Sequence, residues 1–396
     1  MKKYLLVIVL CCTTFLSGCW DLIELSELSV VSGLAVDKGE NKRYKVSVEA
    51  VNATQLNPKT GGNASPSILF SVEGDDIGEV TQKMNIGLSR HLVYSHMRAV
   101  VISEEVAKEG VNDIFDFLER NREIRNDFNI VIARGSEAAD ILSVVYPLQK
   151  VSSMKINAQL ETLEKEWGGD PGVRLNDMIQ ALLSKGREPV AAGVSIEGSA
   201  EKGESMENMQ KVKLDAIVKA DSLAVLKKGK FIGYLDLEDT RQYLMITDKL
   251  KHTTFTIPCG ENDYFAIRVY HNDTVTHVKY KKGTPRATVS LTMEAYIDSV
   301  SCKKDLGKVA TYEEFEKLAE QYISKKIEQT IEKTQQQYGA DIFGFGEKMF
   351  VQDYRNFKKV EKRWNEEFVD MEIDVDTVVK IRRSGIDRGI FIDETS

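Results

Sequence analysis

The chain has 396 residues, of which 42% are hydrophobic and 29% are charged, and only 7 are proline. Because domains cluster near 100–150 residues, this length predicts two or three globular domains. The formal net charge of −8 disfavours nucleic acid as a partner, since phosphate binding requires a basic surface. It also disfavours broad electrostatic adhesion to anionic lipid headgroups.

The N-terminal residues have the order of parts found in a secretory signal. Lysines at positions 2 and 3 precede an apolar run over residues 4–10, and Leu16-Ser17-Gly18-Cys19 follows. A transmembrane helix needs about 20 apolar residues, so cleavage of this shorter segment is favoured over its retention. The small residues before a cysteine resemble the bacterial lipobox. The simpler alternative is an ordinary cysteine in a secreted protein that carries no lipid.

We expect residues 1–18 to be removed as a signal peptide, and Cys19 to carry S-diacylglycerol and N-palmitoyl groups. One acyl chain gives marginal membrane binding whereas two hold firmly, so this cysteine would be a stable tether. Loss of residues 1–18 removes two lysines and no acids, which moves the net charge to −10. Of the other cysteines, Cys259 and Cys302 then remain. In an oxidising exterior they could form one disulfide, and the sequence leaves the pairing open.

Residues 20–205 alternate between strand-like and helical patterns. Residues 43–51 place apolar side chains at every second position, which is typical of a strand with one wet face. Ser103 and Ser136 each predict a helix N-terminus. This alternation indicates an α/β domain over residues 19–205 with a parallel or mixed sheet. Strands are expected at residues 28–36, 43–51, 67–72, 97–102 and 127–133; helices at 75–88, after 103, at 136–142, 154–167 and 174–183; and a loop at 57–66.

A polar segment with no apolar period, GSAEKGESMEN at residues 198–208, is the best candidate for a linker. We therefore expect a domain boundary near residue 205. A small middle domain would follow at residues 206–258, with short strands at 214–220, 222–226 and 230–235 and a helix at 237–246.

The last domain, residues 259–396, has the clearest pattern. Residues 287–297 and 369–375 alternate apolar and polar side chains, as half-buried antiparallel strands do. Between them a long helix is expected to begin at a capping box formed by Thr311 and Glu314. The fold class is therefore mixed α/β and α+β: three domains, mixed sheets flanked by helices, the last domain an antiparallel sheet with one long helix.

No catalytic constellation is found in the sequence. The chain lacks a GxSxG elbow, an HExxH helix, a Walker A loop and a CxxC pair, so we expect no enzyme, cofactor or metal site. The spacing of His91 and His96 puts them on different faces of a helix or strand, which favours a packed or hydrogen-bonded role over metal binding. Gly344 and Gly346 lack the third glycine of a dinucleotide-binding turn, so a tight turn between helices is the better interpretation.

Two clusters of charge remain. Arg120, Arg122 and Arg125 are suited to an anion, but the carboxylates interspersed among them favour internal ion pairs. An acidic row on one strand face is compatible with calcium or a basic partner. The simpler interpretation is a solvated face opposed by Lys279 and Lys281, because opposite charges attract across strands. The row comprises Asp370, Glu372, Asp374 and Asp376.

Several segments together resemble the Ger(x)C family, the C-subunit lipoproteins of spore germinant receptors in Bacillus and related spore formers. They are GCWDLIEL with SGLAVDKG, RHLVYSHMRAVVISEEVAKEGVNDIFDFLERNREIRNDFNIVIARG, KKGKFIGYLDLEDTRQYLMI, and DIFGFGEKMF with the later Trp364. The resemblance implies a three-domain lipoprotein on the outer face of the spore inner membrane. It also implies two integral membrane partners, an A subunit and a transporter-like B subunit. Only Cys19, as the lipidated residue, carries over from the family.

Two functions follow as hypotheses. The first is a non-enzymatic receptor subunit that contributes assembly or signal coupling with the A and B subunits in nutrient germination. The alternative is an extracytoplasmic solute-binding lipoprotein that captures a nutrient directly. A hydrolase is a third class, but the sequence offers no residue to carry it.

Overall fold

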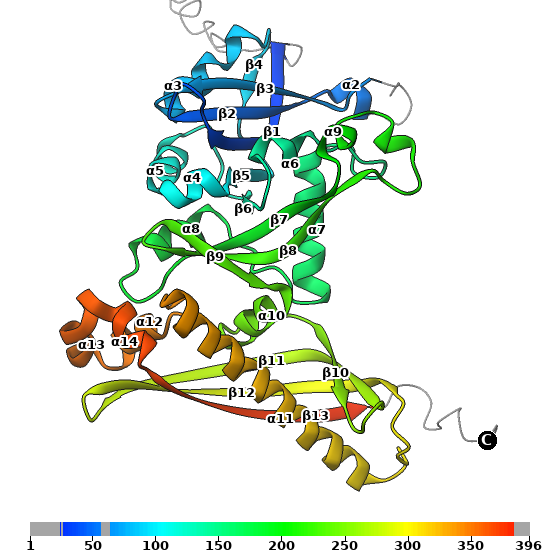
Figure 1. The fold of residues 1–396 in the computed structure, drawn as a ribbon, viewed down its shortest axis with the longest axis vertical. Coiled ribbons are helices and arrows are strands. Elements are labelled where there is room, and N and C mark those ends of the chain that lie inside the picture. The colour runs from blue at the N-terminus through cyan, green and yellow to red at the C-terminus, as the bar shows by residue number, and fades with distance from the viewer. Residues whose placement is uncertain (1–23, 25–26, 57–63, 384–396) are drawn as a thin grey trace, which may run out of the picture.

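The computed structural model describes residues 24, 27–56 and 64–383, which form two β-sheets one below the other along the long axis of the molecule (Figure 1). Among these residues the first sheet has nine strands and the second has four. Helices flank both sheets, and one long helix crosses the second. The expected mixed α/β and α+β fold class is confirmed.

The nine-stranded sheet has a parallel centre with antiparallel margins. Its order is β3-β2-β1-β5-β6-β7-β8-β9, with β4 beside β1. Strands β1, β5, β6 and β7 pair in parallel, whereas β2 and β3 on one side and β8 and β9 on the other pair antiparallel. The bounds are β1 Leu28–Lys38, β2 Tyr44–Val51, β3 Ser67–Gly74, β4 His91–Val93, β5 Ala99–Ser103, β6 Asn129–Ala133, β7 Val190–Gly198, β8 Ala216–Lys227 and β9 Lys230–Asp236.

Helices cover both faces of this sheet, so its central strands are buried on both sides. Within β1, Leu34 belongs to the large hydrophobic cluster that includes Ile114 of α5, whereas its neighbour Ala35 belongs to a second cluster with Ile156 of α7. Adjacent side chains of a strand point to opposite faces, which places these helices on opposite sides. The helix bounds are α2 Ala53–Leu56, α3 Ile77–Lys83, α4 Glu104–Glu109, α5 Asn112–Arg120, α6 Ala138–Ser143, α7 Ser152–Glu166 and α8 Leu175–Leu183.

The segment expected to be a linker, residues 198–208, connects two strands of the same sheet. It contains the short helix α9, Ala200–Gly203, and leads through a 3-10 turn to β8, which pairs with β7. The buried Asn208 amide donates to Val145 O at 2.9 Å and its Oδ1 accepts from Asp215 N at 2.8 Å. The sheet therefore continues across residue 205, and the division of the chain into three domains stays a prediction.

Strand β8 is continuous where the sequence predicted two short strands. Its pairing with β7 shifts register so that Gly193 faces Ser222 and Val194 faces Ala220, which leaves Asp221 as the extra residue of a β-bulge. The polar Asp221 interrupts the apolar pattern without ending the strand, because a bulge accommodates one unpaired residue.

The second sheet has the order β10-β11-β12-β13, and the long helix α11 lies across it (Figure 1). Strands β11 and β12 form a long hairpin that turns at Lys282 and Gly283, both with positive φ. The bounds are α10 Leu237–Ile246, β10 Thr253–Pro258, β11 Tyr264–Lys281, β12 Thr284–Val300, α11 Val309–Lys333, α12 Phe345–Gln352, α13 Tyr354–Val360, α14 Trp364–Val369 and β13 Glu372–Arg383.

Two local expectations for this region are wrong. Strand β13 pairs with β12 in parallel, because the chain crosses back over the sheet through α11 to α14 before β13 begins. Helix α11 begins at Val309 without a side-chain cap. Thr311 Oγ1 instead donates to Asp305 O at 2.8 Å, and Glu314 binds Lys304. Both side chains of the expected capping box are therefore engaged elsewhere: Thr311 with the Asp305 carbonyl, and Glu314 with Lys304.

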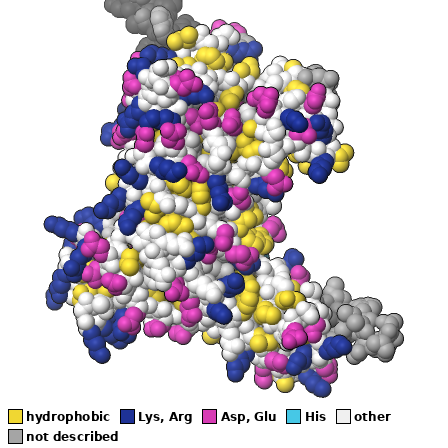
Figure 2. Space-filling view, viewed as in Figure 1, with side chains coloured by type: hydrophobic (Ala, Val, Ile, Leu, Met, Phe, Trp, Pro, Cys, Tyr) yellow, Lys and Arg dark blue, Asp and Glu magenta, His cyan; other side chains and the backbone are white. Residues whose placement is uncertain are grey.

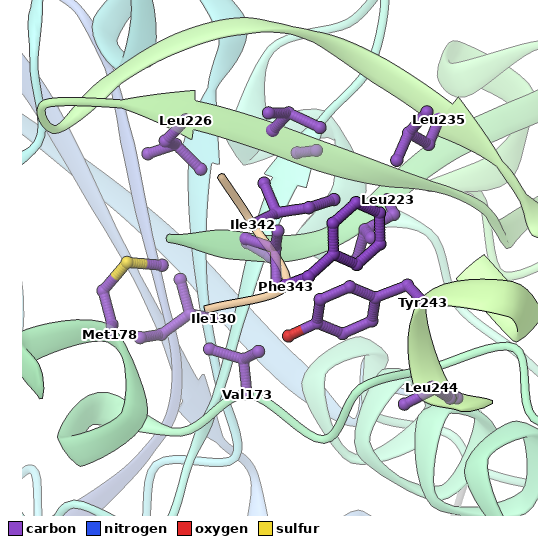
Figure 3. Close-up of a cluster of buried hydrophobic side chains, with 14 of the residues drawn as sticks. Ile130, Val173, Met178, Leu223, Leu226, Leu235, Tyr243, Leu244, Ile342 and Phe343 are labelled. Carbon is purple, nitrogen blue, oxygen red and sulfur yellow. The ribbon is translucent and has the colours of Figure 1, made fainter. Parts of the chain in front are cut away.

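The two sheets share a continuous hydrophobic core. Figure 3 shows Ile342 and Phe343, which follow α11, among Ile130 of β6, Leu223 and Leu226 of β8, and Tyr243 of α10. All these side chains are buried and belong to one cluster that also contains Phe315 and Ile323 of α11. Burial of apolar area is the main stabilising term in folding, so this core joins residues near both ends of the described chain.

Candidate functional site

The predicted lipid attachment site, Cys19, lies outside the described residues. The first strand, β1, begins nine residues later at Leu28, where it pairs with His91 of β4. These strands lie at one end of the molecule, at the top of Figure 1. Across the part of the chain that the structure describes, no helix is both long and apolar enough to traverse a bilayer.

Two buried carboxylates hold helices onto the first sheet. Asp37 accepts hydrogen bonds from Ala138 N at 2.6 Å and Ala139 N at 2.9 Å. Burial raises its pKa to about 6, although these two bonds oppose the shift. This carboxylate satisfies the start of α6, so the expected cap from Ser136 is wrong. The acidic residue near the end of an apolar strand is a sequence signal for a buried contact, but it does not identify the helix that is contacted.

Glu49, on β2, does the same for α7. It is fully buried and accepts from Ser152 N at 2.9 Å, Ser153 N at 3.1 Å and Ser32 Oγ at 3.0 Å. Burial raises its pKa, and the bonds to the helix N-terminus and the hydroxyl oppose that rise. A carboxylate is stabilised there because the first N–H groups of a helix have no partners within it.

The glycine-containing segment around residue 344 forms a third buried polar centre. Asp341 is 0% exposed and accepts from Gly344 N at 2.9 Å, Gly346 N at 2.8 Å and Trp364 Nε1 at 2.8 Å. Burial raises the pKa of this carboxyl to about 6, against the effect of the three bonds. Gly344 has a φ of 79°, a conformation that favours glycine. The segment lies between the helical turn that ends at Tyr338 and α12, so the interpretation as a tight turn between helices is confirmed.

This turn is in direct backbone contact with the loop before β7. A Cβ added to Gly346 would lie 2.5 Å from Gly186 Cα, and one added to Gly186 would lie 2.4 Å from the Gly346 carbonyl carbon. Glu347 N donates to Gly186 O at 3.2 Å, and Glu188 N donates to Asp341 O at 2.7 Å. The two halves of the chain meet here at a separation that only glycine permits.

A second contact between the halves is built on Arg241 of α10, which is 4% exposed. Its guanidinium carbon lies 4.9 Å from the centre of the Trp167 ring and 4.2 Å from that of Phe255. It also donates to Thr254 O at 2.9 Å and pairs with Glu238. A guanidinium between two aromatic faces is a favourable arrangement. This residue therefore links the end of α7 to strand β10.

The histidine pair and the cysteine pair that the sequence singled out have different outcomes in the structure. His91 is exposed on β4, whereas His96 is bonded to Ser95 Oγ at 2.9 Å. Within the described ranges, no group of three or more His, Cys, Asp or Glu side chains is placed to hold a metal ion. Cys259 and Cys302, whose pairing the sequence left open, form a disulfide with a Cα–Cα distance of 6.3 Å.

Three members of the predicted acidic row lie on an edge strand, whereas the fourth, Asp370, precedes that strand at the end of α14. Glu372, Asp374 and Asp376 are exposed on β13, and Glu372 pairs with Arg286 of β12 at 2.6 Å. The expected opposing lysines lie one strand further away: Lys279 of β11 is opposite Arg286. Over the face in Figure 2, acidic and basic side chains are interspersed. Basic side chains gather only along the left edge of that face, where α12 to α14 lie in Figure 1.

The three arginines have different surroundings. Arg120 pairs with Asp116 at 2.8 Å, and Arg125 lies 3.7 Å from Asp127. The expected internal ion pairs are thus present for two of them, although Arg120 uses a carboxylate the sequence did not single out. Arg122 instead lines a cavity between α3, β4 and the end of α5.

Comparison with known proteins finds relatives along nearly the whole chain. Residues 21–196 match a family described as the spore germination protein N-terminal domain, and residues 221–385 match one described as spore germination B3/GerAC like, C-terminal. Spore germination protein KC of Bacillus subtilis is 30% identical over 393 residues, 97% of this chain and 96% of that protein. Spore germination protein B3 of the same organism is 22% identical, over 93% of this chain and 95% of its own.

One solved structure has the same fold. The crystal structure of the GerBC protein aligns with a TM-score of 0.54 and 16% identity, over 91% of this chain and 99% of that one.

Proposed function

Because the chain belongs to the Ger(x)C family of spore germination proteins, we propose that it is the lipid-anchored C subunit of a spore nutrient germinant receptor. The observation that carries the proposal is the match to spore germination protein KC over 97% of this chain, together with a lipobox-like segment ending at Cys19. The role we propose is non-enzymatic: assembly of the receptor or transmission of its signal.

The proposed location is the outer face of the spore inner membrane, beside integral membrane A and B subunits. Leu28 is nine positions after Cys19 in the sequence, and an extended chain spans at most about 3.6 Å per residue. A diacylglyceryl group on Cys19 would thus hold the start of β1 within about 32 Å of the bilayer. The end of the molecule that carries β1, β3 and β4 would face the membrane and its partners.

The shared core supports a role in coupling. Asp341, Gly346 and Arg241 contact Glu188, Gly186 and Trp167, respectively, and so connect the second half of the chain with the first. Because packed interiors resist deformation, a force applied at the anchored end is transmitted to the second sheet. A protein packed in this way is better suited to transmitting a signal between its membrane partners than to a mechanism of opening and closing.

The test is Cys19→Ala in spores that lack the wild-type gene. We expect loss of labelled palmitate, release of the protein from the inner membrane and a reduced response to nutrients. Cys12→Ala is the matched control, because that cysteine lies in the predicted signal peptide and should leave all three readouts unchanged. Normal membrane retention and germination with Cys19→Ala would contradict the proposed anchor.

A further inference from the structure

A cavity of about 470 Å³ lies in the first half of the chain, between α3, β4 and the segment after α5. Its apolar lining comes from Leu92 and Tyr94, which are buried, and from the half-buried Phe117. The Tyr94 hydroxyl donates to Thr81 O at 3.2 Å, so its polar atom is already engaged. This volume falls within the range of about 300–1,000 Å³ that is common for small-ligand sites.

Charged side chains of both signs line the same cavity. Arg122 and Glu123 are adjacent and exposed. Among the described residues, neither lies within 4.0 Å of an oppositely charged group, although Arg120 and Arg125 on either side are both paired. Arg122 is thus the arginine of this cluster whose guanidinium remains available to an anion.

Amide side chains supply further polar groups. Gln82 and Asn85 line the cavity from α3 and the turn after it, and no hydrogen-bond partner of either side chain is found in the described part of the chain. Asn121 also lines it, and its Oδ1 accepts from Glu123 N at 2.9 Å, which orders the backbone between the two. Apolar walls with a few convergent polar groups are typical of sites for small molecules.

We propose that this cavity binds a small zwitterion, with Arg122 on its carboxylate or phosphate and Glu123 on its ammonium group. Arginine binds either anion through two parallel hydrogen bonds. An isolated anion would be repelled by Glu123 and an isolated cation by Arg122, so a ligand that carries both charges is preferred. The proposal concerns a binding activity of this chain and does not depend on the lipid anchor.

Two sources supply this chemistry. His91, which also lines the cavity, is paired with Leu28 at the start of β1, so the cavity adjoins the end of the molecule at which β1 begins. A dissolved amino acid has the required carboxylate and ammonium. A phosphoethanolamine headgroup has the required phosphate and ammonium. The amino acid and the headgroup are tested with separate probes.

The experiment titrates the full mature chain, in a nonionic detergent, by calorimetry with two sets of probes. One set is the free α-amino acids and the other is sn-glycero-3-phosphoethanolamine. We expect saturable binding of at least one probe. Arg122→Gln should weaken it tenfold or more, because a charge-assisted, bidentate contact is lost. Arg120→Gln is the matched control: that residue is exposed, paired with Asp116 and outside the cavity, so affinity should not change.

A second variant tests the ammonium contact. Glu123→Gln should weaken binding of the zwitterion and strengthen binding of acetate or inorganic phosphate, since it removes the charge that repels them. Binding by amino acids alone identifies a dissolved ligand, and binding by the phosphoethanolamine probe alone identifies a headgroup. If no probe binds, or if Arg122→Gln and Arg120→Gln bind equally well, the proposal is wrong.

Discussion

Replacing Gly346 with alanine would place a methyl group between two backbone segments that are already in contact. The new Cβ would lie 2.5 Å from Gly186 Cα and 2.5 Å from Trp364 Nε1, whereas ordinary contacts begin near 3.4 Å. The two segments must therefore separate by roughly 1 Å. Overpacking of this kind costs about 1–3 kcal/mol. Separation also weakens the bonds that join the two segments, from Glu347 N to Gly186 O and from Glu188 N to Asp341 O, each worth about 1 kcal/mol.

We therefore expect Gly346→Ala to lower the free energy of unfolding by about 3–5 kcal/mol. Urea unfolding followed by tryptophan fluorescence measures this directly. The control is Gly260→Ala, where the nearest atom to the new Cβ is 3.5 Å away. This variant should be neutral or more stable by about 0.4–1 kcal/mol. If Gly346→Ala cost no more than the control, the two loops would not be held together by this contact.

Two further predictions concern stability. Replacing both Cys259 and Cys302 with serine should lower the free energy of unfolding by about 4 kcal/mol. This is the loss of chain entropy expected when a disulfide closes a loop with a sequence separation of 43. Equal urea midpoints for the wild type with and without reductant would contradict this. Asp341 has a pKa of about 6 when folded and an ordinary value of 3.8 when unfolded, so the native state retains a proton that the unfolded chain releases between these values. Its contribution to stability is therefore present below about pH 4 and falls as pH rises to about 6, by at most about 3 kcal/mol. The difference in unfolding free energy between wild type and Asp341→Asn should shrink over this interval, and a difference that is constant or grows would refute the assignment.

Local patterns predicted most helices and strands because alternation, apolar stripes and caps depend on neighbouring residues. Ser103 illustrates this: its side chain accepts from Val106 N at 3.4 Å, as expected of an N-cap. The same rule failed at Ser136, because the groups it would have satisfied are bound by Asp37, 101 residues away from Ala138. A distant carboxylate leaves no trace in the residues around the helix it caps.

Sequence reasoning also missed contacts between residues that are far apart in the chain. The sequence identified Gly344 and Gly346 as a turn, but not that Gly186 lies against it. It marked Arg120, Arg122 and Arg125 together as suited to an anion and favoured internal ion pairs for them. Only the structure shows that Arg120 and Arg125 have such pairs, whereas Arg122 has none among the described residues.

The sequence by itself determined the features that depend on composition and on short motifs. These are the lack of recognisable catalytic motifs and membership of a germination family; the same kind of short motif predicts, but does not establish, a signal peptide and lipidation at Cys19. Tertiary structure alone decided that Cys259 meets Cys302, that β13 runs parallel to β12, and that one core joins both sheets. Each of these requires residues far apart in the chain to meet, and the packing that brings them together is a property of the whole fold rather than of any local pattern.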